Sequence, residues 1–378
     1  MANKRGPHKV PQAVAEDTLW GESKPLQGAR LWRYALPLRW PLTTNAGVQQ
    51  RLREGLLLQL RTVEGLTAWG EIAPLPGLHK ETLRQAKLQI QRLLPILLST
   101  HESSGWLGCR DAIHRVSTLP EPLFPSVRWG VETALWQLGA KRFVVRSLET
   151  ALPTVAESAV EPAHAKALSV SALTPPGPPR AMLAHALRRH RQGWRSIKVK
   201  VGHLSPALAA ELTGEIHRTC GRSLPLRLDV GRRWTLAQAL QFGACVQPHW
   251  VEYVEEPVRD PRHIPQLHAQ TGLPCALDET VHEWPLHAIK RLRGVRAWVI
   301  KPALLRGGLR HFFQLARVAD GHGITPVVSS CFESGVGLRI LALLANECPA
   351  LHSAALGLGT ADWFAADWCH FAMQPAYA

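Results

Sequence analysis

Lysine and acidic residues recur at the ends of short apolar runs through the middle of the chain. The runs are SIKVKVG (196–202), LRLDV (226–230), YVEEP (253–257), CALDE (275–279) and AWVIKP (297–302). Counted from Lys200, their polar residues follow one another at gaps of 29, 26, 23 and 23 residues. One strand plus one crossover helix has about this length in a (β/α) barrel, whose active site lies at the carboxyl ends of the strands. The spacing therefore predicts that these side chains meet at one barrel mouth.

Three of the runs end in a carboxylate, at Asp229, Glu255 and Asp278. On three successive strands of a closed ring, these side chains should converge on one point. Oxygen ligands without cysteine or histidine suit Mg²⁺, with Mn²⁺ as a second option. Three carboxylates buried together without a cation would be strongly destabilising. We therefore predict a metal site formed by these three residues.

Lysines lie on both sides of the predicted metal site. Lys198 and Lys200 are two residues apart on one strand, so they point to the same face. Lys301 comes four strands later, across an eight-stranded ring. Two ammonium groups near a divalent cation disfavour double protonation, which should lower the pKa of one lysine and supply a general base. Such a site suits removal of a proton next to a carboxylate, because a metal stabilises the enediolate that forms.

Further polar residues near the predicted mouth are candidates for substrate binding. Arg227 precedes Asp229 by two residues and should share its inward face, where it either clamps a substrate carboxylate or pairs with the acidic cluster. Ser329 and Ser330 end the predicted seventh strand. Together with the backbone amides that open a helix at about Ser334, they could hold an anionic group, since helix N-termini bind anions.

Two other features are candidates for covering or supporting the site. The loop LTTNAG (42–47) and His79 could close over a substrate. Glu256 and Glu279 adjoin predicted ligands but alternate to the other face of their strands, so we do not expect them to bind the metal.

The segments that must position these residues alternate between strand and helix patterns. Eight strands are expected, beginning at ALSVSAL (167–173), continuing through the five runs above, and ending with TPVVSS (325–330) and HSAALGLG (352–359). This alternation predicts parallel pairing with right-handed crossovers, which is a TIM-like barrel. Residues 28–75 instead show an antiparallel meander pattern, followed by helical spacing over 79–99. We therefore expect an α/β chain with an α+β capping domain.

The expected domain organisation has four parts. A flexible basic segment covers residues 1–27, the capping domain 28–125, the barrel 126–359, and a C-terminal tail that packs on the cap 360–378. The chain of 378 residues is long enough for a barrel of roughly 250 residues plus this smaller domain.

Composition excludes some classes of protein and leaves others open. The net charge is +15 and the pI about 10, but the basic residues are dispersed, so nucleic-acid binding is only a remote alternative to a small anionic substrate. No apolar run approaches the roughly 20 residues of a membrane span, and the N-terminus has no apolar signal core. Seven scattered cysteines without a CxxC pair favour free thiols and a cytoplasmic location. The oligomeric state is not readable.

The ordered set of motifs resembles the enolase superfamily in its muconate-lactonising subgroup. The resemblance is carried by Lys198-Val-Lys200, LRLDVGRRW, Glu255-Glu256-Pro257, Asp278-Glu279 and Ile300-Lys301-Pro302. Finer features are similar to the o-succinylbenzoate synthase family: REGLLLQL, AWGEIAPLPGLHKETL, SSCFESGVGL and LGLGTADWF. One departure is Asp229-Val230-Gly231, where the superfamily usually has Asp-Ala-Asn.

The resemblance implies a fold and a reaction. The fold would be a (β/α)₇β barrel with a capping domain. The reaction would be Mg²⁺-dependent dehydration of 2-succinyl-6-hydroxy-2,4-cyclohexadiene-1-carboxylate to o-succinylbenzoate, a lyase step of menaquinone biosynthesis. Lys200 would remove the proton and return it to the departing hydroxyl, and Lys301 would stabilise the anionic intermediate. N-acylamino acid racemases and dipeptide epimerases share this scaffold, and the lysines on both sides would serve them equally well.

Overall fold

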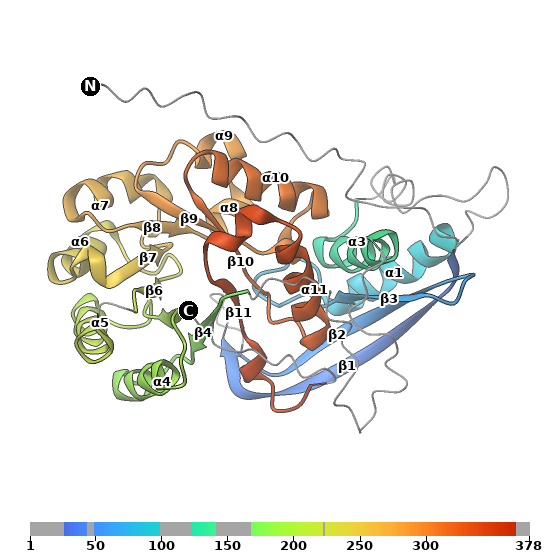
Figure 1. Ribbon diagram of the computed structural model, residues 1–378, viewed down its shortest axis with the longest axis horizontal. Helices are drawn as coiled ribbons and strands as arrows, with labels where there is room; N and C mark the ends of the chain where they lie inside the picture. The colour runs from blue at the N-terminus through green and yellow to red at the C-terminus, as the bar shows by residue number, and fades with distance from the viewer. Residues whose placement is uncertain (1–25, 44–48, 99–121, 141–167, 222–223, 368–378) are drawn as a thin grey trace, which may run out of the picture.

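The computed structural model describes residues 26–43, 49–98, 122–140, 168–221 and 224–367 of the chain. Figure 1 shows a barrel of parallel strands with outer helices, beside a smaller sheet that carries its own helices. The predicted fold class, a (β/α)₇β barrel with an α+β cap, is confirmed.

The cap is built on a three-stranded antiparallel meander. Strands β1 (Leu26–Thr43), β2 (Gln49–Thr62) and β3 (Thr67–Ile72) pair in chain order. Alternate residues of β2 face two different cores. Leu56, Leu58 and Leu60 pack with helices α1 (Leu83–Leu98) and α3 (Pro125–Ala140), whereas Leu57 packs in the barrel's core cluster. Because both faces are covered, the β2 sequence is nearly continuously apolar from Gly55 to Leu60.

Helix α1 begins later than the 79–99 pattern predicts. Thr82 caps it: the Thr82 hydroxyl accepts from the Gln85 backbone N–H (3.2 Å), and the Gln85 side chain accepts from the Thr82 N–H (2.8 Å). This reciprocal pair is a capping box. His79 lies in the turn before it, where its ring bonds backbone groups instead of joining the helix.

The eight predicted barrel strands are all present, and the parallel sheet runs in the order β10-β9-β8-β7-β6-β5-β4-β11. A parallel bridge between Ser329 and Gly357 joins its two edges and closes the ring. The strands are β4 (Val170–Thr174), β5 (Ile197–Lys200), β6 (Leu226–Asp229), β7 (Val251–Glu255), β8 (Cys275–Leu277), β9 (Val295–Ile300), β10 (Thr325–Val328) and β11 (Leu356–Gly359).

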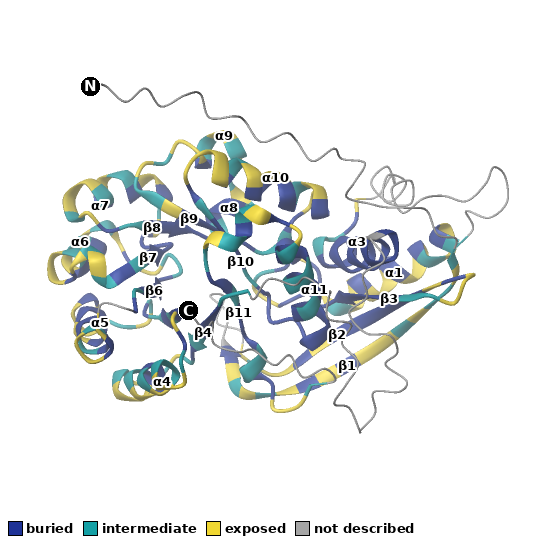
Figure 2. Cartoon of the chain, viewed as in Figure 1, coloured by how far each residue is buried: buried dark blue, intermediate teal, exposed yellow. Residues whose placement is uncertain are grey.

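Each strand except the last leads into at least one helix on the outside of the ring. These are α4 (Pro179–Arg191), α5 (Pro206–Cys220), α6 (Leu236–Cys245), α7 (Ile264–Thr271), the short α8 (Glu279–Glu283) and α9 (Leu286–Ile289), α10 (Gly308–Gly321) and α11 (Gly335–Asn346). Figure 2 shows the barrel strands largely buried and most of the outer helices exposed on one face, as amphipathic crossover helices require.

Helix α3 is buried on every side along its described length. Val127, Val131 and Leu135 belong to the core of the cap, while Trp129 and Trp136 belong to that of the barrel. We therefore propose that the cap extends through α3, to about residue 140, and not to 125 as the sequence suggested; the other predicted boundaries stay predictions.

The chain returns to the cap after the last barrel strand. The Ala365 N–H donates to the Pro37 carbonyl of β1 (2.8 Å), and Phe364 forms a bridge with Leu38. This agrees with the expected packing of the tail, although residues 1–25 and 368–378 lie outside the described part. Across the described residues, no helix combines the length and the apolar character needed to span a membrane.

Candidate active site

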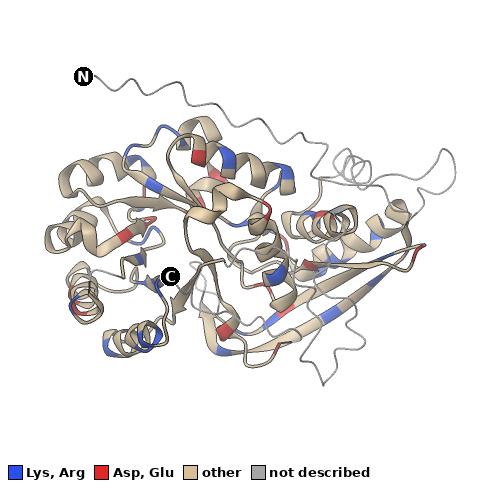
Figure 3. Ribbon diagram, viewed as in Figure 1, with Lys and Arg blue, Asp and Glu red and all other residues tan. Residues whose placement is uncertain are grey.

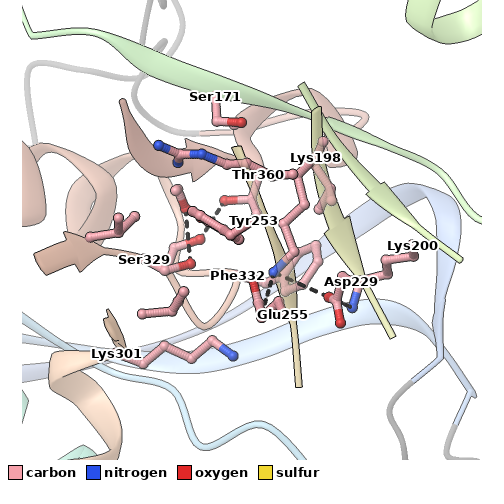
Figure 4. Close-up of a pocket in the computed structure, with 17 residues that line it drawn as sticks. Ser171, Lys198, Lys200, Asp229, Tyr253, Glu255, Lys301, Ser329, Phe332 and Thr360 are labelled. Atoms are coloured by element: carbon pink, nitrogen blue, oxygen red, sulfur yellow. Dashed lines mark hydrogen bonds and ion pairs between the residues drawn. The ribbon is translucent and has the colours of Figure 1, made fainter. Parts of the chain in front are cut away.

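Strand register brings the predicted site residues to one end of the barrel. Lys200, Asp229 and Glu255 pair side by side across β5, β6 and β7, so they lie at one level. Lys198 and Arg227 lie one level deeper. Figure 4 shows the side chains converging on a cavity of about 70 Å³. All the predicted site residues except Asp278 line it, and Asp278 is paired with the lining residue Lys301.

Ammonium groups lie directly on the three carboxylates. Lys198 Nζ is 2.6 Å from Glu255 Oε1 and 3.1 Å from Asp229 Oδ2. Lys200 Nζ is also 3.1 Å from Asp229 Oδ2. Across the ring, Lys301 donates to Asp278 Oδ2. The lysine side chain at the mouth, that of Lys200, is 36% exposed, against 18% for Lys198 and 12% for Lys301.

Two of the three carboxylates have a buried oxygen atom that a cation could bind. Glu255 Oε2 and Asp278 Oδ1 are buried without a hydrogen-bond partner, which is costly for an ionised group. A hard divalent cation is the partner that such oxygens suit. In the described part of the chain, no group of three or more His, Cys, Asp or Glu side chains is arranged to hold a metal as it stands. Here the ammonium groups of Lys198 and Lys301 occupy the other carboxylate oxygens, so metal binding requires them to move.

The electrostatics reflect this crowding. Burial, together with the charges of Asp229 and Asp278, raises the pKa of Glu255 to about 8. For Asp229, burial opposes ionisation, but Lys198 and Lys200 outweigh it and hold the pKa below its usual range. Burial would lower the pKa of Lys198, yet Asp229 and Glu255 raise it well above the usual value. The predicted lowering of one lysine pKa depends on a bound cation and stays a prediction.

Arg227 is fully buried and pairs with a carboxylate outside the predicted cluster. Its Nε and one terminal nitrogen each donate to Glu252 at 2.7 Å, its other terminal nitrogen donates to the Ala355 carbonyl at 2.6 Å, and it stacks 5.1 Å from the Tyr253 ring. Its charge is therefore already offset by a bidentate partner. Arg227 does line the cavity, so a role in substrate binding stays a prediction.

The two predicted serines also line the cavity. The Ser329 hydroxyl donates to the Gly357 carbonyl (3.2 Å), and the Ser330 hydroxyl bonds that of Thr360 (2.8 Å). The N-terminus of α11, which we expected from the sequence to bind an anionic group, already holds a carboxylate of the protein. Glu71 of the cap accepts from the backbone N–H groups of Ser334 (2.8 Å) and Gly337 (2.9 Å). This part of the prediction is wrong, because a protein carboxylate fills the anion position.

His79 does not close over the cavity. Its Nδ1 accepts from the Leu75 N–H (2.9 Å), so its Nε2 carries the proton and donates to the Ala303 carbonyl (3.0 Å). The ring thereby ties the cap to the segment after Lys301. Burial lowers its pKa to about 4, which keeps it neutral. Most of the loop 42–47 lies outside the described residues.

Glu256 supports the site in a way that strand alternation alone does not identify. It is fully buried, with a φ of +42°, and its Oε1 accepts from the backbone N–H groups of Asp278 (2.9 Å) and Thr280 (2.7 Å). Its Oε2 accepts from Arg232 Nε at 2.9 Å. The motif Glu255-Glu256-Pro257 thus supplies one carboxylate to the cavity and a second to the backbone of a neighbouring strand end.

Comparison with known proteins places the chain in a family. The family model for the enolase C-terminal domain-like fold matches residues 181–370, and the model described as MenC, N-terminal domain, matches residues 26–138. The chain is 34% identical over 343 residues to o-succinylbenzoate synthase of Vibrio cholerae serotype O1 (strain M66-2), covering 88% of this chain and 90% of that protein. The chain belongs to the o-succinylbenzoate synthase family of the enolase superfamily. It is an enzyme of the lyase class.

The chain has two further similarities, one to a much longer protein and one to a solved structure of the same fold. The chain is 32% identical over 347 residues to the chloroplastic protein PHYLLO of Arabidopsis thaliana, covering 83% of this chain but 20% of that much longer protein. Among solved structures, the chain is similar to a dipeptide epimerase from Cytophaga hutchinsonii complexed with Mg and the dipeptide D-Ala-L-Val, with a TM-score of 0.72 and 18% identity over 92% of this chain and 89% of that one. The second similarity confirms the fold of this synthase-family member.

Proposed function

We propose that the chain is an o-succinylbenzoate synthase. It would dehydrate 2-succinyl-6-hydroxy-2,4-cyclohexadiene-1-carboxylate to o-succinylbenzoate, a step of menaquinone biosynthesis. The observation that carries the proposal is the cluster of Lys198, Lys200, Asp229, Glu255 and Lys301 around one cavity. It occurs in a chain that is similar to a curated o-succinylbenzoate synthase over most of both sequences.

Lys200 is the lysine best placed to move a proton. Lys198 bridges two carboxylates, whereas Lys200 pairs with Asp229 and lies at the exposed mouth. Its amine would remove the proton next to the substrate carboxylate and then protonate the departing hydroxyl, so that water leaves. Lys301, on the opposite side, would contribute its positive charge to the anionic intermediate.

The metal role belongs to Asp229, Glu255 and Asp278. Mg²⁺ bound there would supply positive charge next to the substrate carboxylate and favour loss of the neighbouring proton. A Mg-complexed structural neighbour of the same fold supports this choice of ion, and Mn²⁺ is the substitute with similar ligand preferences.

The charges around the cavity favour an anionic substrate. Three ammonium groups, on Lys198, Lys200 and Lys301, face the three carboxyl groups of the proposed metal site, so the cluster carries no net negative charge without a cation. A divalent cation makes it positive, and carboxylates of a substrate would restore neutrality. Figure 3 shows Lys and Arg spread over both the cap and the barrel in the described residues, which agrees better with a small anion than with a nucleic-acid strand.

Epimerisation of an N-acylamino acid or dipeptide is the second candidate. It is supported by amines on both sides of the cavity, Lys200 and Lys301, and by the fold shared with a dipeptide epimerase. A dehydration needs one base, whereas an epimerisation needs a proton-transferring group on each face of one carbon. The reactions therefore predict different consequences for the loss of Lys301.

The test is an assay of the purified protein with Mg²⁺ on the cyclohexadiene substrate and, separately, on an N-succinyl amino acid. We expect formation of o-succinylbenzoate, its loss in excess chelator, and its recovery with Mg²⁺. Lys200→Ala should reduce kcat by at least about a hundredfold, because a general base contributes about 10²–10⁴-fold. Lys301→Arg keeps a cation and should retain part of the dehydration.

Lys290→Ala provides a matched control, since Lys290 is exposed and outside the residues that line the cavity. An o-succinylbenzoate yield that survives complete metal removal, or a Lys200→Ala variant with a near-normal rate, would contradict the proposed mechanism. The epimerase would be favoured by two results together. The α-proton of an N-succinyl amino acid would exchange faster than the cyclohexadiene is dehydrated, and Lys301→Arg would abolish that exchange for one enantiomer.

A further inference from the structure

The segment between β10 and α11 forms one wall of the cavity in a conformation that needs support. Ser329, Ser330 and Phe332 from this segment all line the cavity, and Figure 4 shows Phe332 beside the lysines and carboxylates. Phe332 has a φ of +59°, in the left-handed region that bulky residues rarely adopt. Such a conformation persists only where surrounding contacts impose it.

Arg53 on β2 of the cap supplies those contacts. Its Nε donates to the Phe332 carbonyl at 2.9 Å, and a terminal nitrogen donates to the Cys331 carbonyl at 3.3 Å. The guanidinium also donates to the carbonyls of Ala73 and Pro74, just after β3. It is 1% exposed, yet it is not among the residues that line the cavity. Its positive charge is therefore solvated largely by carbonyl groups from two loops.

A second cap side chain holds the other end of the same segment. Glu71 on β3 accepts from the Ser334 backbone N–H (2.8 Å), the Ser334 hydroxyl (2.7 Å) and the Gly337 N–H (2.9 Å). The Tyr34 hydroxyl donates to Glu71 from β1. The segment 331–337 is thus bonded at its carbonyls by an arginine and at its amides by a carboxylate, both from the cap.

The geometry points to Arg53 as a positioning residue for the substrate. Resting on the proposed function, we propose that Arg53 fixes the position of the Phe332 side chain. The part of the substrate that is remote from the reacting carbon packs against this side chain, and Arg53 itself does not touch the substrate. The planar fork of an arginine can reach carbonyls of both loops at once, which the single ammonium of a lysine cannot do. Arg53 therefore couples the cap to substrate affinity through Phe332.

The opposing view is that Arg53 only holds the cap on the barrel. The two views differ in what its loss changes. A purely structural residue lowers stability and reduces the fraction of active enzyme, which lowers the apparent kcat and leaves KM unchanged. A residue that positions the cavity wall raises KM for the substrate while Mg²⁺ affinity is kept, since Arg53 does not contact the predicted metal ligands.

The experiment compares Arg53→Met with Arg33→Met in the full-length, Mg²⁺-loaded protein. Arg33 is an exposed arginine of the same sheet that pairs with Glu54 on the surface. We expect Arg53→Met to raise KM for the cyclohexadiene substrate about tenfold, because a displaced Phe332 ring no longer packs against the substrate, with kcat within about threefold. Arg33→Met should leave both unchanged. Mg²⁺ affinity, measured by calorimetry, should be the same in all three proteins.

A double-mutant cycle with Phe332→Ala tests whether Arg53 acts through the ring. If it does, Arg53→Met should raise KM in the wild-type background but add little in the Phe332→Ala background. Should Arg53→Met fail to fold, Arg53→Lys provides the second variant, with an intermediate rise in KM expected. An unchanged KM with lower stability, or KM effects that multiply in the double variant, would overturn the proposal.

Hydrogen–deuterium exchange separates this proposal from the proposed function. Backbone amides in residues 329–337 should exchange faster in Arg53→Met than in wild type or Arg33→Met, whatever substrate the enzyme uses. If wild type does not dehydrate the cyclohexadiene, the proposed function fails, while the exchange result still decides whether Arg53 holds the segment. If wild type is active but neither KM nor exchange responds to Arg53→Met, the proposed function stands and the role of Arg53 is refuted.

Discussion

At the scale of single residues, Glu256 shows how a side chain that does not face the cavity can govern a metal ligand. Its carboxylate accepts the Asp278 N–H and is itself held by Arg232 and by the Thr280 hydroxyl (2.9 Å for each). The backbone of Asp278 has to place the side chain within reach of a cation. Hydrogen-bond partners that orient a ligand in this way usually affect metal affinity.

We therefore predict that Glu256→Gln weakens Mg²⁺ binding by about 10–100-fold. The amide loses the negative charge that Arg232 pairs with, and it places an NH₂ group against backbone donors. Calorimetric Mg²⁺ titration measures the effect without depending on catalysis. Glu283→Gln is the matched control, since Glu283 also pairs with Arg232 but its side chain is 55% exposed. Equal Mg²⁺ affinity in Glu256→Gln and wild type would show that Glu256 has no such role.

The sequence pattern placed most of the site residues at one cavity because their positions follow one rule, a polar residue at or near the carboxyl end of each strand. Lys198, Lys200, Asp229, Glu255 and Lys301 all lie where that rule places them. It could not predict the partner of Arg227, because Glu252 belongs to a different strand and its contact depends on side-chain conformation.

At the scale of elements, strand β3 and helix α3 cross at two glycines. A Cβ on Gly70 would lie 1.8 Å from the Gly130 carbonyl oxygen, whereas a Cβ on Gly130 would meet the Ile72 side chain at 2.4 Å and the Glu71 carbonyl oxygen at 3.1 Å. The first clash involves backbone and cannot be relieved by rotating a side chain. The close approach lets α3 lie against the sheet and fill both cores.

Gly70→Ala should consequently lower the free energy of unfolding by about 1–3 kcal/mol, the usual cost of overpacking. Gly130→Ala should cost less, because the Ile72 side chain can move and alanine gains about 1 kcal/mol of helix propensity over glycine. Urea denaturation monitored by circular dichroism gives both values. Gly28→Ala on β1, where a Cβ would meet nothing within 4 Å, should change stability little. Equal stability of Gly70→Ala and Gly28→Ala would contradict this account of the crossing.

Local periodicity predicted the types of these elements but not their partners. The strand–helix repeat gave all eight barrel strands, whereas the helical spacing over 79–99 did not locate the Thr82–Gln85 capping box at which α1 begins. The α3 pattern did not reveal its membership in the cap, because the helix is buried almost all round and contacts elements far away in sequence.

At the scale of the whole molecule, the cap is joined to the barrel by buried polar side chains that bond backbone groups. Arg53 and Glu71 bond the segment after β10, as described above. Glu132 of α3 accepts from the Leu309 N–H (2.7 Å) at the start of α10, and His79 donates to Ala303 in the segment after Lys301. Sequence patterns do not reveal such contacts, because any residue at the receiving position presents the same backbone group.

One of these contacts should make stability depend on pH. His79 is 9% exposed, and its ring is neutral, with Nδ1 accepting a hydrogen bond from the Leu75 N–H while Nε2 donates to the Ala303 carbonyl. Burial lowers its folded-state pKa from 6.5 to about 4. A histidine with a lowered folded pKa contributes stability that is present above its unfolded pKa and is lost as pH falls. The window is therefore about pH 6.5 down to about pH 4, and the loss is at most about 3–4 kcal/mol.

We predict that thermal unfolding of the wild type shifts to lower temperature between pH 7.5 and pH 5, and that His79→Gln shows a smaller shift. Glutamine lacks a group that protonates in this window, so the variant should be less stable at pH 7.5 but lose less on acidification. His287→Gln, at an exposed position, controls for removal of a histidine and should titrate like wild type. His185 and His282, whose pKa values burial also lowers to about 4, remain in every variant, so the shift should shrink but not vanish. If the pH-dependent change in melting temperature is the same in His79→Gln as in wild type, protonation of His79 does not loosen the junction between cap and barrel.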